Sequence, residues 1–235
     1  MEGWIVKLIL DHITMVRDNF SLSANGEFSE GVHLISGEVG SGKSTLALAI
    51  AGIISAQSGG ISRYGIGTVM LLFQFPEYHI TGMTLEEECV SFGCEPEEIF
   101  SLPDLHGKNH QSPFSLSRGE LKQFHLSCIL RRHYDLLLLD EPFGALDCET
   151  KKKVCDHLSQ LTNSITIIFT HEQAILPRVD RIWEIIDGKL LDRGTLPDAI
   201  REWYGAPPLV KKLIARGKIP RNISYDDVLE AACRT

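Results

Sequence analysis

Residues 34–45 read LISGEVGSGKST: a short apolar run, a glycine-rich turn and the start of a helix-forming segment. The turn fits the pattern G-x-x-x-x-G-K-[ST], with Gly37, Gly42, Lys43 and Ser44 at its fixed positions. Glycines let backbone N–H groups curl around phosphate oxygens, and the N-terminus of the following helix adds partial positive charge. The stretch therefore predicts a strand, a loop that holds nucleotide phosphates, and a helix in succession.

Two side chains of this loop have specific roles in the prediction. Lys43 is expected to reach the β- and γ-phosphates, and the Ser44 hydroxyl is expected to ligate Mg²⁺. Backbone groups along the loop are expected to contact the nucleotide as well. The predicted nucleotide-binding residues of the loop are Gly37, Glu38, Val39, Gly40, Ser41, Gly42, Lys43, Ser44 and Thr45.

A second segment, LLLLDEP at residues 136–142, is expected to supply the acidic residues of the same nucleotide site. Its unbroken apolar run is typical of a strand buried on both faces, with Asp140 at the carboxyl end. Ligands bind at the carboxyl ends of such strands, so Asp140 is expected to hold Mg²⁺. Glu141 follows directly, where a carboxylate can orient and deprotonate an attacking water.

Three further polar residues fall in places where they could join this site. Gln74 is expected to end the strand within residues 67–74, and His171 the strand within residues 164–171. His171 could contact a γ-phosphate from there. Ser117 opens a helix with a serine capping pattern, FSLSRGE, at residues 114–120. Because all the strand ends meet at one edge of a parallel sheet, these side chains could converge.

Strand-like and helix-like segments alternate through the middle of the chain. This alternation predicts an α/β fold, with a mostly parallel sheet covered by helices on both faces. Residues 181–194 read as a hairpin with Asp187-Gly188 at its turn. From Thr195 onward prolines cluster and the elements become short helices, so we expect a small C-terminal extension at 195–235.

Composition and charge restrict the classes of partner. The formal net charge of −8 argues against a broad nucleic-acid-binding surface, so no nucleic acid partner is expected. The longest apolar run, residues 46–54, is far shorter than the ~20 residues that span a bilayer, although docking on a membrane stays open. Six cysteines without a C-x-x-C pair, in a chain with no evident signal peptide, are expected to be reduced cytosolic thiols.

At this point the sequence resembles the ATP-binding subunit of ABC transporters. Six motifs of that family occur in the family's order: Walker A at 37–45, the Q-loop at Gln74, the signature LSRGE at 116–120, Walker B at 136–141, the D-loop GALD at 144–147, and the H-loop at His171. The resemblance implies a P-loop ABC ATPase fold with a RecA-like, mostly parallel core sheet and an N-terminal antiparallel β part. It places an ABC ATPase domain at 1–194, with a helical subdomain inserted at about 75–130.

The resemblance also implies a mechanism. Two ATPase subunits, as a homodimer or a heterodimer, sandwich two nucleotides head to tail, with ATP and Mg²⁺ as the bound groups. Ser117 and Gly119 of one subunit would touch the γ-phosphate held by Walker A of the other, and Asp147 of the D-loop is a further implied nucleotide-binding residue. The implied catalytic residues are Glu141, His171 and Gln74, and the implied metal ligands are Ser44, Gln74 and Asp140.

Two segments resemble one branch of the family more narrowly. FQFPEYHITGMTLEEE at 73–88 and the tail at 207–231 are similar to those of energy-coupling factor transporters, which import vitamins and transition-metal ions. This implies a subunit on the cytoplasmic face of a prokaryotic cell membrane, with a transmembrane coupling subunit and a substrate-binding membrane subunit as partners. The alternative is a soluble ABC ATPase, such as an iron–sulfur assembly type, not coupled to transport.

The chain departs from the family pattern in two places. In the signature, Arg118 stands where a glycine is usual and Glu120 where glutamine is usual. The Arg118 side chain could point to solvent, contact phosphate, or weaken the site that the signature completes. The aromatic residue that usually stacks on adenine is also missing, so Arg17 or Phe20 is expected in that role, with core packing as the other interpretation of Phe20.

Overall fold

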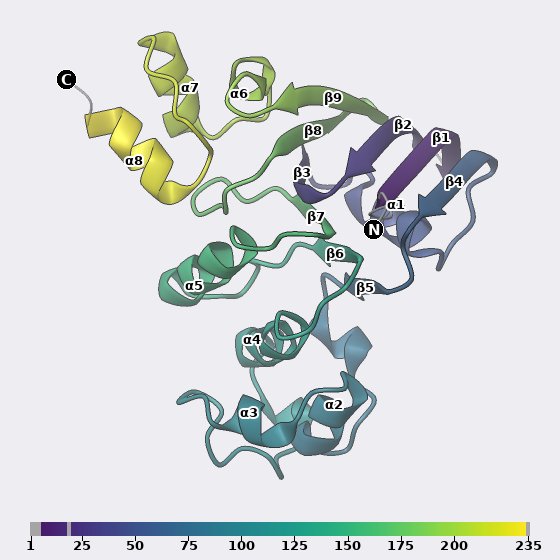
Figure 1. The fold of residues 1–235 in the computed structure, drawn as a ribbon, viewed down its shortest axis with the longest axis vertical. Coiled ribbons are helices and arrows are strands. Elements are labelled where there is room, and N and C mark those ends of the chain that lie inside the picture. The colour runs from purple at the N-terminus through teal and green to yellow at the C-terminus, as the bar shows by residue number, and fades with distance from the viewer. Residues whose placement is uncertain (1–5, 18–19, 234–235) are drawn as a thin grey trace, which may run out of the picture.

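In the computed structural model, which describes residues 6–17 and 20–233, the strands form one sheet (Figure 1). Five neighbouring strands make the parallel core of this sheet, in the spatial order β8-β3-β7-β6-β5. Because these strands are buried on both faces, they are the almost continuous apolar runs of the sequence. Their bounds are β3 (Gly31–Gly37), β5 (Val69–Leu72), β6 (Leu136–Asp140), β7 (Ile165–Thr170) and β8 (Arg181–Ile186).

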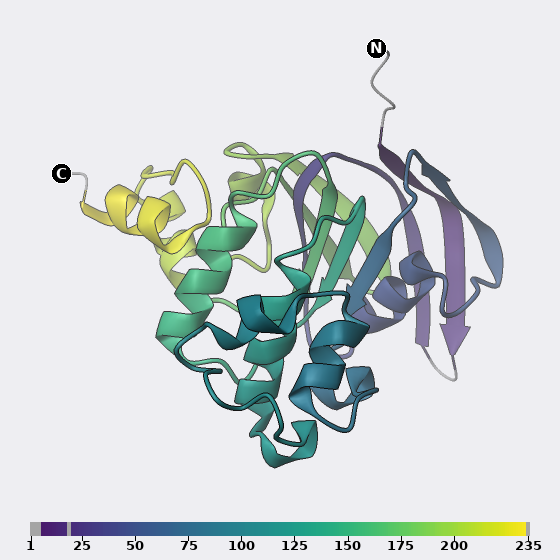
Figure 2. The same ribbon diagram turned by 60° about the horizontal axis from the view of Figure 1, so that its bottom comes forward.

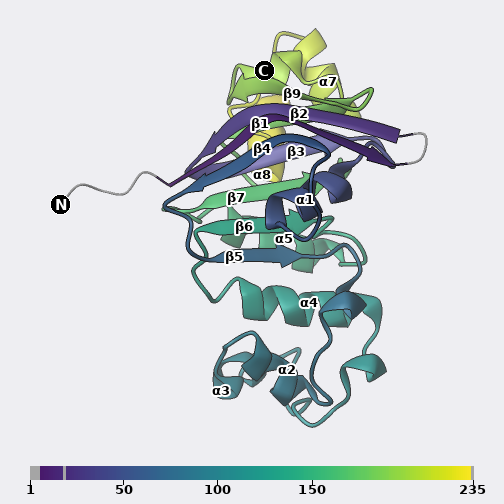
Figure 3. The ribbon, with the colours of Figure 1, turned by 90° about the vertical axis from the view of Figure 1, so that its right-hand side faces the viewer.

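The other described strands extend the sheet on the β8 side, and the full order is β4-β1-β2-β9-β8-β3-β7-β6-β5. β1 pairs antiparallel with β2 and with β4, and β9 pairs antiparallel with β8. This places the N-terminal strands beside the parallel core, as expected for the antiparallel β part (Figure 3). Their bounds are β1 (Lys7–Arg17), β2 (Phe20–Ser29), β4 (Ser58–Tyr64) and β9 (Lys189–Thr195).

The two faces of the sheet build two separate hydrophobic cores. In β6, Leu137 and Leu139 belong to the core that contains α4 (Arg118–Ile129) and α5 (Cys148–Leu158). Leu136 and Leu138 belong to the opposite core, which contains α1 (Lys43–Ala51) and the N-terminal strands. The alternation follows from the two-residue period of a strand, and it fixes helices on both faces.

A helical region projects from the β5 side of the sheet, away from β1, β2 and β4 (Figure 2 and Figure 3). It has a third core of its own, to which α4 contributes Leu121, Phe124 and Cys128. Thr84 caps the first of its helices by accepting a hydrogen bond from the Glu87 N–H at 3.2 Å. The other elements of the region are η1 (Pro76–His79), α2 (Leu85–Ser91), α3 (Pro96–Phe100) and η2 (Pro113–Ser115).

The C-terminal helices α6 (Ala199–Glu202), α7 (Pro208–Ala215) and α8 (Tyr225–Cys233) lie at the opposite side of the molecule (Figure 1). Trp203, Val210 and Val228 from this segment join the core that contains α5. The extension is therefore packed against the sheet rather than separate from it. The domain boundary at residue 195 stays a prediction.

Several expectations about single elements are confirmed and others are wrong. The hairpin of β8 and β9 turns at Asp187 and Gly188, whose φ angles of 48° and 69° suit a two-residue hairpin turn. The helix expected after the loop is α1, and it ends before the apolar run of residues 46–54 does, because Gly52 adopts φ 83° and caps it. β5 ends at Leu72, so Gln74 lies beyond the strand that it was expected to end. Strands β2 and β4 were not anticipated.

None of the described helices is long and apolar enough to cross a membrane.

Candidate active site

The glycine-rich loop holds the Lys43 ammonium in its own hollow. Lys43 Nζ donates to the carbonyl oxygens of Gly37 at 2.8 Å and Glu38 at 3.0 Å. The same nitrogen lies 3.7 Å from Glu141 Oε1, and the side chain is buried, so burial lowers the pKa of Lys43. Gly42 has φ 103°, a backbone conformation that favours glycine, and this turn leads directly into α1.

Phe20 packs over the end of this loop. A Cβ on Gly42 would lie only 2.5 Å from Phe20 Cζ, so the ring and the glycine are in close contact. Phe20 also lines the cleft beside the loop, so it packs against the protein and borders the site at once. Its stacking on adenine stays a prediction, and the Arg17 side chain lies outside the described residues.

Asp140 lies at the carboxyl end of β6, buried next to the first turn of α1. Burial raises the pKa of Asp140, and the neighbouring Ser44 hydroxyl opposes this shift by stabilising the carboxylate. The oxygen Oδ1 is buried without a hydrogen-bond partner. An unpartnered carboxylate oxygen beside a hydroxyl is the donor set that a hard cation such as Mg²⁺ binds, so these residues fit the metal.

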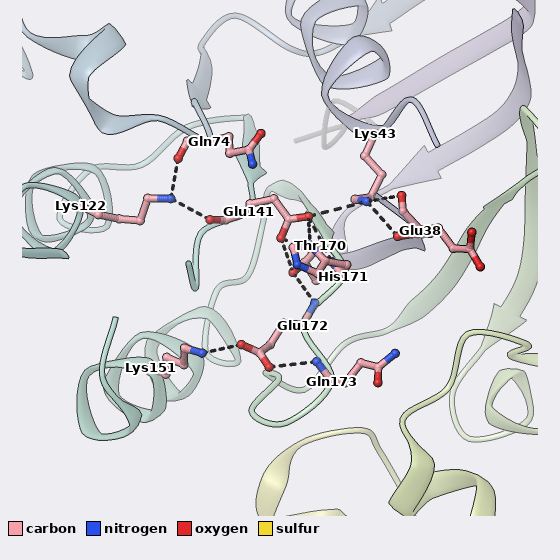
Figure 4. Close-up of polar contacts among 11 residues, drawn as sticks. Glu38, Lys43, Gln74, Lys122, Glu141, Lys151, Thr170, His171, Glu172 and Gln173 are labelled. Carbon is pink, nitrogen blue, oxygen red and sulfur yellow. Dashed lines mark hydrogen bonds and ion pairs between the residues drawn. The ribbon is translucent and has the colours of Figure 1, made fainter. Parts of the chain in front are cut away.

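Glu141 is the centre of the polar cluster (Figure 4). The Thr170 hydroxyl donates to its Oε2 at 2.9 Å, and His171 Nδ1 lies 2.6 Å from its Oε1. Its backbone has φ 48°, a left-handed conformation that is strained for a glutamate. The strained backbone directs the carboxylate toward Lys43 and His171. A carboxylate held by several donors at the carboxyl edge of a parallel sheet can orient a nucleophilic water.

A cleft of 1490 Å³ opens over this cluster. The loop, the strand ends and the C-terminal segment all contribute to its walls, including Trp203 and Tyr204. Lys43, Ser44 and Thr45 lie beneath it, in the first turn of α1. The predicted site residues that line the cleft are Gly37, Glu38, Val39, Gly40, Ser41, Glu141 and His171.

The predicted site residues at the N-terminus of α4 do not line this cleft. Ser117 caps α4 in a reciprocal capping box with Glu120, and its side chain accepts from the Glu120 N–H at 3.3 Å. A Cβ on Gly119 would lie 2.5 Å from the Ala145 carbonyl oxygen, so only glycine fits there. Asp147 caps α5 by accepting from the Thr150 N–H at 2.8 Å. Gly119 of the α4 N-terminus thus lies against Ala145, two residues before Asp147, and Ser117, Gly119 and Asp147 do not line the cleft beside the glycine-rich loop.

Comparison with known proteins agrees with this geometry. The family model for ABC transporters matches residues 23–144, and the energy-coupling factor transporter ATP-binding protein EcfA of Methanosarcina acetivorans is 33% identical over 78% of each chain. This chain belongs to the ABC transporter family. It is the ATPase subunit of a transporter, and the hydrolysis of ATP is its reaction.

Other relatives give the same assignment. The energy-coupling factor transporter ATP-binding protein EcfA2 of Thermotoga maritima is 26% identical over 86% of each chain. The sulfate/thiosulfate import ATP-binding protein CysA of Synechocystis is 31% identical, but this chain spans only 59% of its length. A nucleotide-free ABC transporter cassette superposes with a TM-score of 0.62 at 17% identity, covering 84% of this chain and 94% of the cassette, which shows the fold alone.

The structure places the unusual arginine of the ABC signature against the Q-loop segment. Arg118 Nε donates to Glu77 Oε1 at 3.0 Å, and its guanidinium lies over the Phe75 ring, 5.4 Å from the centroid. The side chain is more than half exposed, so the ion pair is a weak one. None of the three sequence-based interpretations of Arg118 included this contact.

The sequence analysis did not predict a role for Lys122, which lies on α4 of this ABC ATPase, one turn after Arg118. Its ammonium is buried and donates to the carbonyl oxygens of Gln74 and Glu141, each at 2.8 Å. Burial lowers the pKa of Lys122 to about 8. Gln74 joins the cluster through this carbonyl, while its exposed amide remains a predicted metal ligand. No local pattern in the sequence marks Lys122, because a lysine in a helix usually faces solvent.

His79, which follows the Q-loop and is partly buried, pairs with the buried His125 of α4. His79 Nε2 accepts a hydrogen bond from the Phe73 N–H at 2.9 Å, and its ring lies 5.3 Å from that of His125. Burial, reinforced by His125, lowers the pKa of His79 to about 4 from its ordinary 6.5. Protonation of Nε2 would break the hydrogen bond that holds the Phe73 backbone.

This pair gives a pH-dependent stability. Because the folded pKa is below the unfolded one, the unfolded chain binds the proton first, and stability falls as the pH falls from about 6.5 toward 4. Between about pH 7.5 and pH 5, His79 should cost about 2 kcal/mol of unfolding free energy. Urea unfolding of the wild type and of His79→Gln at both pH values measures this cost. The difference in unfolding free energy between the two proteins should be smaller at pH 5 than at pH 7.5 by about 2 kcal/mol. Parallel losses in both proteins would show that His79 does not titrate in this way.

Proposed function

We propose that this chain powers an importer of the energy-coupling factor class, which takes up a vitamin or a transition-metal ion. The observation that supports this is the similarity to relatives named as energy-coupling factor transporter ATP-binding proteins, over 78–86% of both chains. The match to the sulfate importer covers much less of that protein. Because these relatives are named as transport proteins, a soluble ABC ATPase of the iron–sulfur assembly type is the weaker alternative.

The ATPase works as a dimer in this proposal. Ser117 and Gly119 stand at the N-terminus of α4 and do not line the cleft beside the glycine-rich loop of their own chain. A helix N-terminus binds anions, so it suits the γ-phosphate held by the loop of a second subunit. The partner is a second copy of this chain or a related ATPase. Measuring the mass of the pure protein with bound ATP distinguishes these partners: a doubled mass indicates a second copy of this chain, and a monomer mass indicates that a related ATPase is needed.

The site residues have the following roles in the proposed reaction. Walker A and Lys43 bind the triphosphate, and Glu141 orients and deprotonates the attacking water. His171 contacts the γ-phosphate. Ser44, Asp140 and Gln74 would hold Mg²⁺, which when bound neutralises charge on the phosphate oxygens. The unpartnered Asp140 oxygen supports this assignment.

The segment after the Q-loop is proposed to dock on a transmembrane coupling subunit at the cytoplasmic face of the membrane. It carries several large apolar side chains in exposed positions: Tyr78 is 71% exposed and Met83 is 81% exposed. Exposed apolar groups of this size mark interaction surfaces. Arg118 connects this segment to the signature helix, so the proposed docking surface and the nucleotide interface are in contact.

A charge placed on this surface should prevent assembly. We expect Tyr78→Asp to lower the amount of ATPase recovered with detergent-solubilised membranes at least about tenfold, because burying an unpaired carboxylate costs several kcal/mol. Tyr64→Asp is the matched control, since Tyr64 is 53% exposed on β4, at the far side of the sheet. Equal recovery of both variants would place the docking surface elsewhere.

Reconstitution tests the function itself. The tagged chain is purified from solubilised membranes, its membrane partners are identified by mass spectrometry, and the complex is placed in vesicles. ATP-dependent accumulation of a labelled vitamin or transition-metal ion is the expected result. Recovery of an active ATPase with no membrane protein would support the soluble alternative instead.

A further inference from the structure

Lys122 occupies a place that the reaction as described above leaves unexplained. Its side chain is 2% exposed, and its ammonium lies between the carbonyl oxygens of Gln74 and Glu141 (Figure 4). Burying an ammonium is strongly unfavourable unless polar partners replace its water. Here two carbonyl oxygens at 2.8 Å do so, and both belong to segments of the active site.

The contact to Glu141 acts on a strained piece of backbone. Glu141 has φ 48°, a left-handed conformation that is strained for a non-glycine residue. Its N–H donates to the Phe169 carbonyl at 2.8 Å, and its C=O accepts from Lys122. Both backbone groups are therefore held, and together they keep the carboxylate directed toward Lys43 and His171.

The contact to Gln74 fixes the start of the Q-loop. β5 runs parallel to β6 in register from Val69 with Leu136 to Leu72 with Leu139, and the chain leaves the sheet after that. The carbonyl of Gln74 is then held by the same ammonium that holds Glu141. One side chain thus sets the position of the Q-loop relative to the Walker B strand.

The helix that carries Lys122 also carries the signature. Ser117 caps this helix, and Lys122 lies in its second turn. A movement of the signature helix would therefore act on both Gln74 and Glu141 through this one buried ammonium, beside the exposed contact of Arg118 to Glu77. A lysine that only filled space would not need its ammonium directed at these two oxygens.

We propose that Lys122 is a positioning residue, which holds the Glu141 backbone against the Q-loop so that the carboxylate is oriented for hydrolysis. This inference rests on the proposed role of Glu141 as the base. It assigns to Lys122 an effect on the chemical step rather than on nucleotide binding.

The test compares three substitutions in the full-length chain. In Lys122→Met, which keeps the length but removes the ammonium, kcat for ATP should fall roughly 10- to 100-fold. KM should stay within about threefold, because binding groups are untouched. Lys122→Arg should restore kcat to within about threefold, since a guanidinium can reach both carbonyls. Lys153→Met, at an exposed lysine of α5, is the control and should change neither parameter.

Further measurements distinguish a failure of the Lys122 inference from misfolding and from a failure of the proposed role of Glu141. If Lys122→Met does not fold, Lys122→Gln carries the test, because its amide still donates to one carbonyl without charge. Thermal unfolding of each variant shows whether a loss of rate is only a loss of folded protein. An unchanged kcat in a folded Lys122→Met or Lys122→Gln variant overturns the inference. Glu141→Gln is measured in parallel: if it keeps its turnover, the proposed role of Glu141 fails instead.

Discussion

Glu141→Gln should lower the turnover of ATP by roughly 10³-fold and leave ATP binding intact. The amide keeps the shape of the side chain and can still contact Thr170 and His171, which lie 2.9 Å and 2.6 Å from the carboxylate oxygens. It cannot accept a proton from water at neutral pH. The variant therefore separates binding, which Walker A provides, from the chemical step.

The same variant should accumulate the closed dimer. If hydrolysis opens the two subunits, a chain that binds ATP without cleaving it remains associated, and size-exclusion chromatography with ATP and Mg²⁺ should show the doubled mass. Glu98→Gln is the matched control, because Glu98 is an exposed glutamate on α3. An ATPase rate equal to that of wild type would reject Glu141 as the base.

Lys43→Ala should weaken ATP binding by several hundredfold. The ammonium is placed to exchange its contacts with the Gly37 and Glu38 carbonyls for phosphate oxygens. Hydrogen bonds to a charged group are worth about 1.5–3 kcal/mol each, so losing two of them at the lower end of this range costs about 3–4 kcal/mol. Because about 1.4 kcal/mol corresponds to a tenfold change in affinity, this cost predicts that ATP binds several hundredfold more weakly.

Titration with ATP by calorimetry measures this affinity directly. Lys212→Ala is the control, since Lys212 is exposed on α7 and carries the same charge. Thermal unfolding of Lys43→Ala without nucleotide is needed as well, because the substitution leaves Glu141 without the ion pair at 3.7 Å. A folded variant that binds ATP as tightly as the wild type would contradict the role of Lys43.

Much of this architecture could be predicted from local patterns. The apolar runs that became β3, β6 and β7 are long enough to identify, and the polar residues at their ends are adjacent in sequence to the strands that place them. Lys43, Asp140 and Glu141 were therefore expected together, and the structure brings them together. The helix caps at Thr84 and Ser117 follow from short-range chemistry as well.

Other features depend on contacts between distant parts of the chain. Strand β4 is exposed along almost its whole length and contains two adjacent glycines, so no apolar period marks it. Arg118 meets Glu77 across 41 residues, and no local pattern pairs them. Lys122 is a cation, which in a helix usually faces solvent. Its burial became visible only once α4 was placed against the Walker B strand.

Helix α4 belongs to two hydrophobic cores, and this limits how the molecule can be recombined with its homologues. Leu121 and Phe124 pack among the helical elements, whereas Leu126 and Ile129 pack against the sheet. A chimera that exchanged only residues 75–117, between the Q-loop and α4, would alter the core of the helical region and leave the core under the sheet filled. One that also exchanged α4 would open voids under the sheet, and each buried methylene lost there costs about 1 kcal/mol. Natural or engineered crossovers in this chain are therefore better tolerated ahead of Ser117 than behind it.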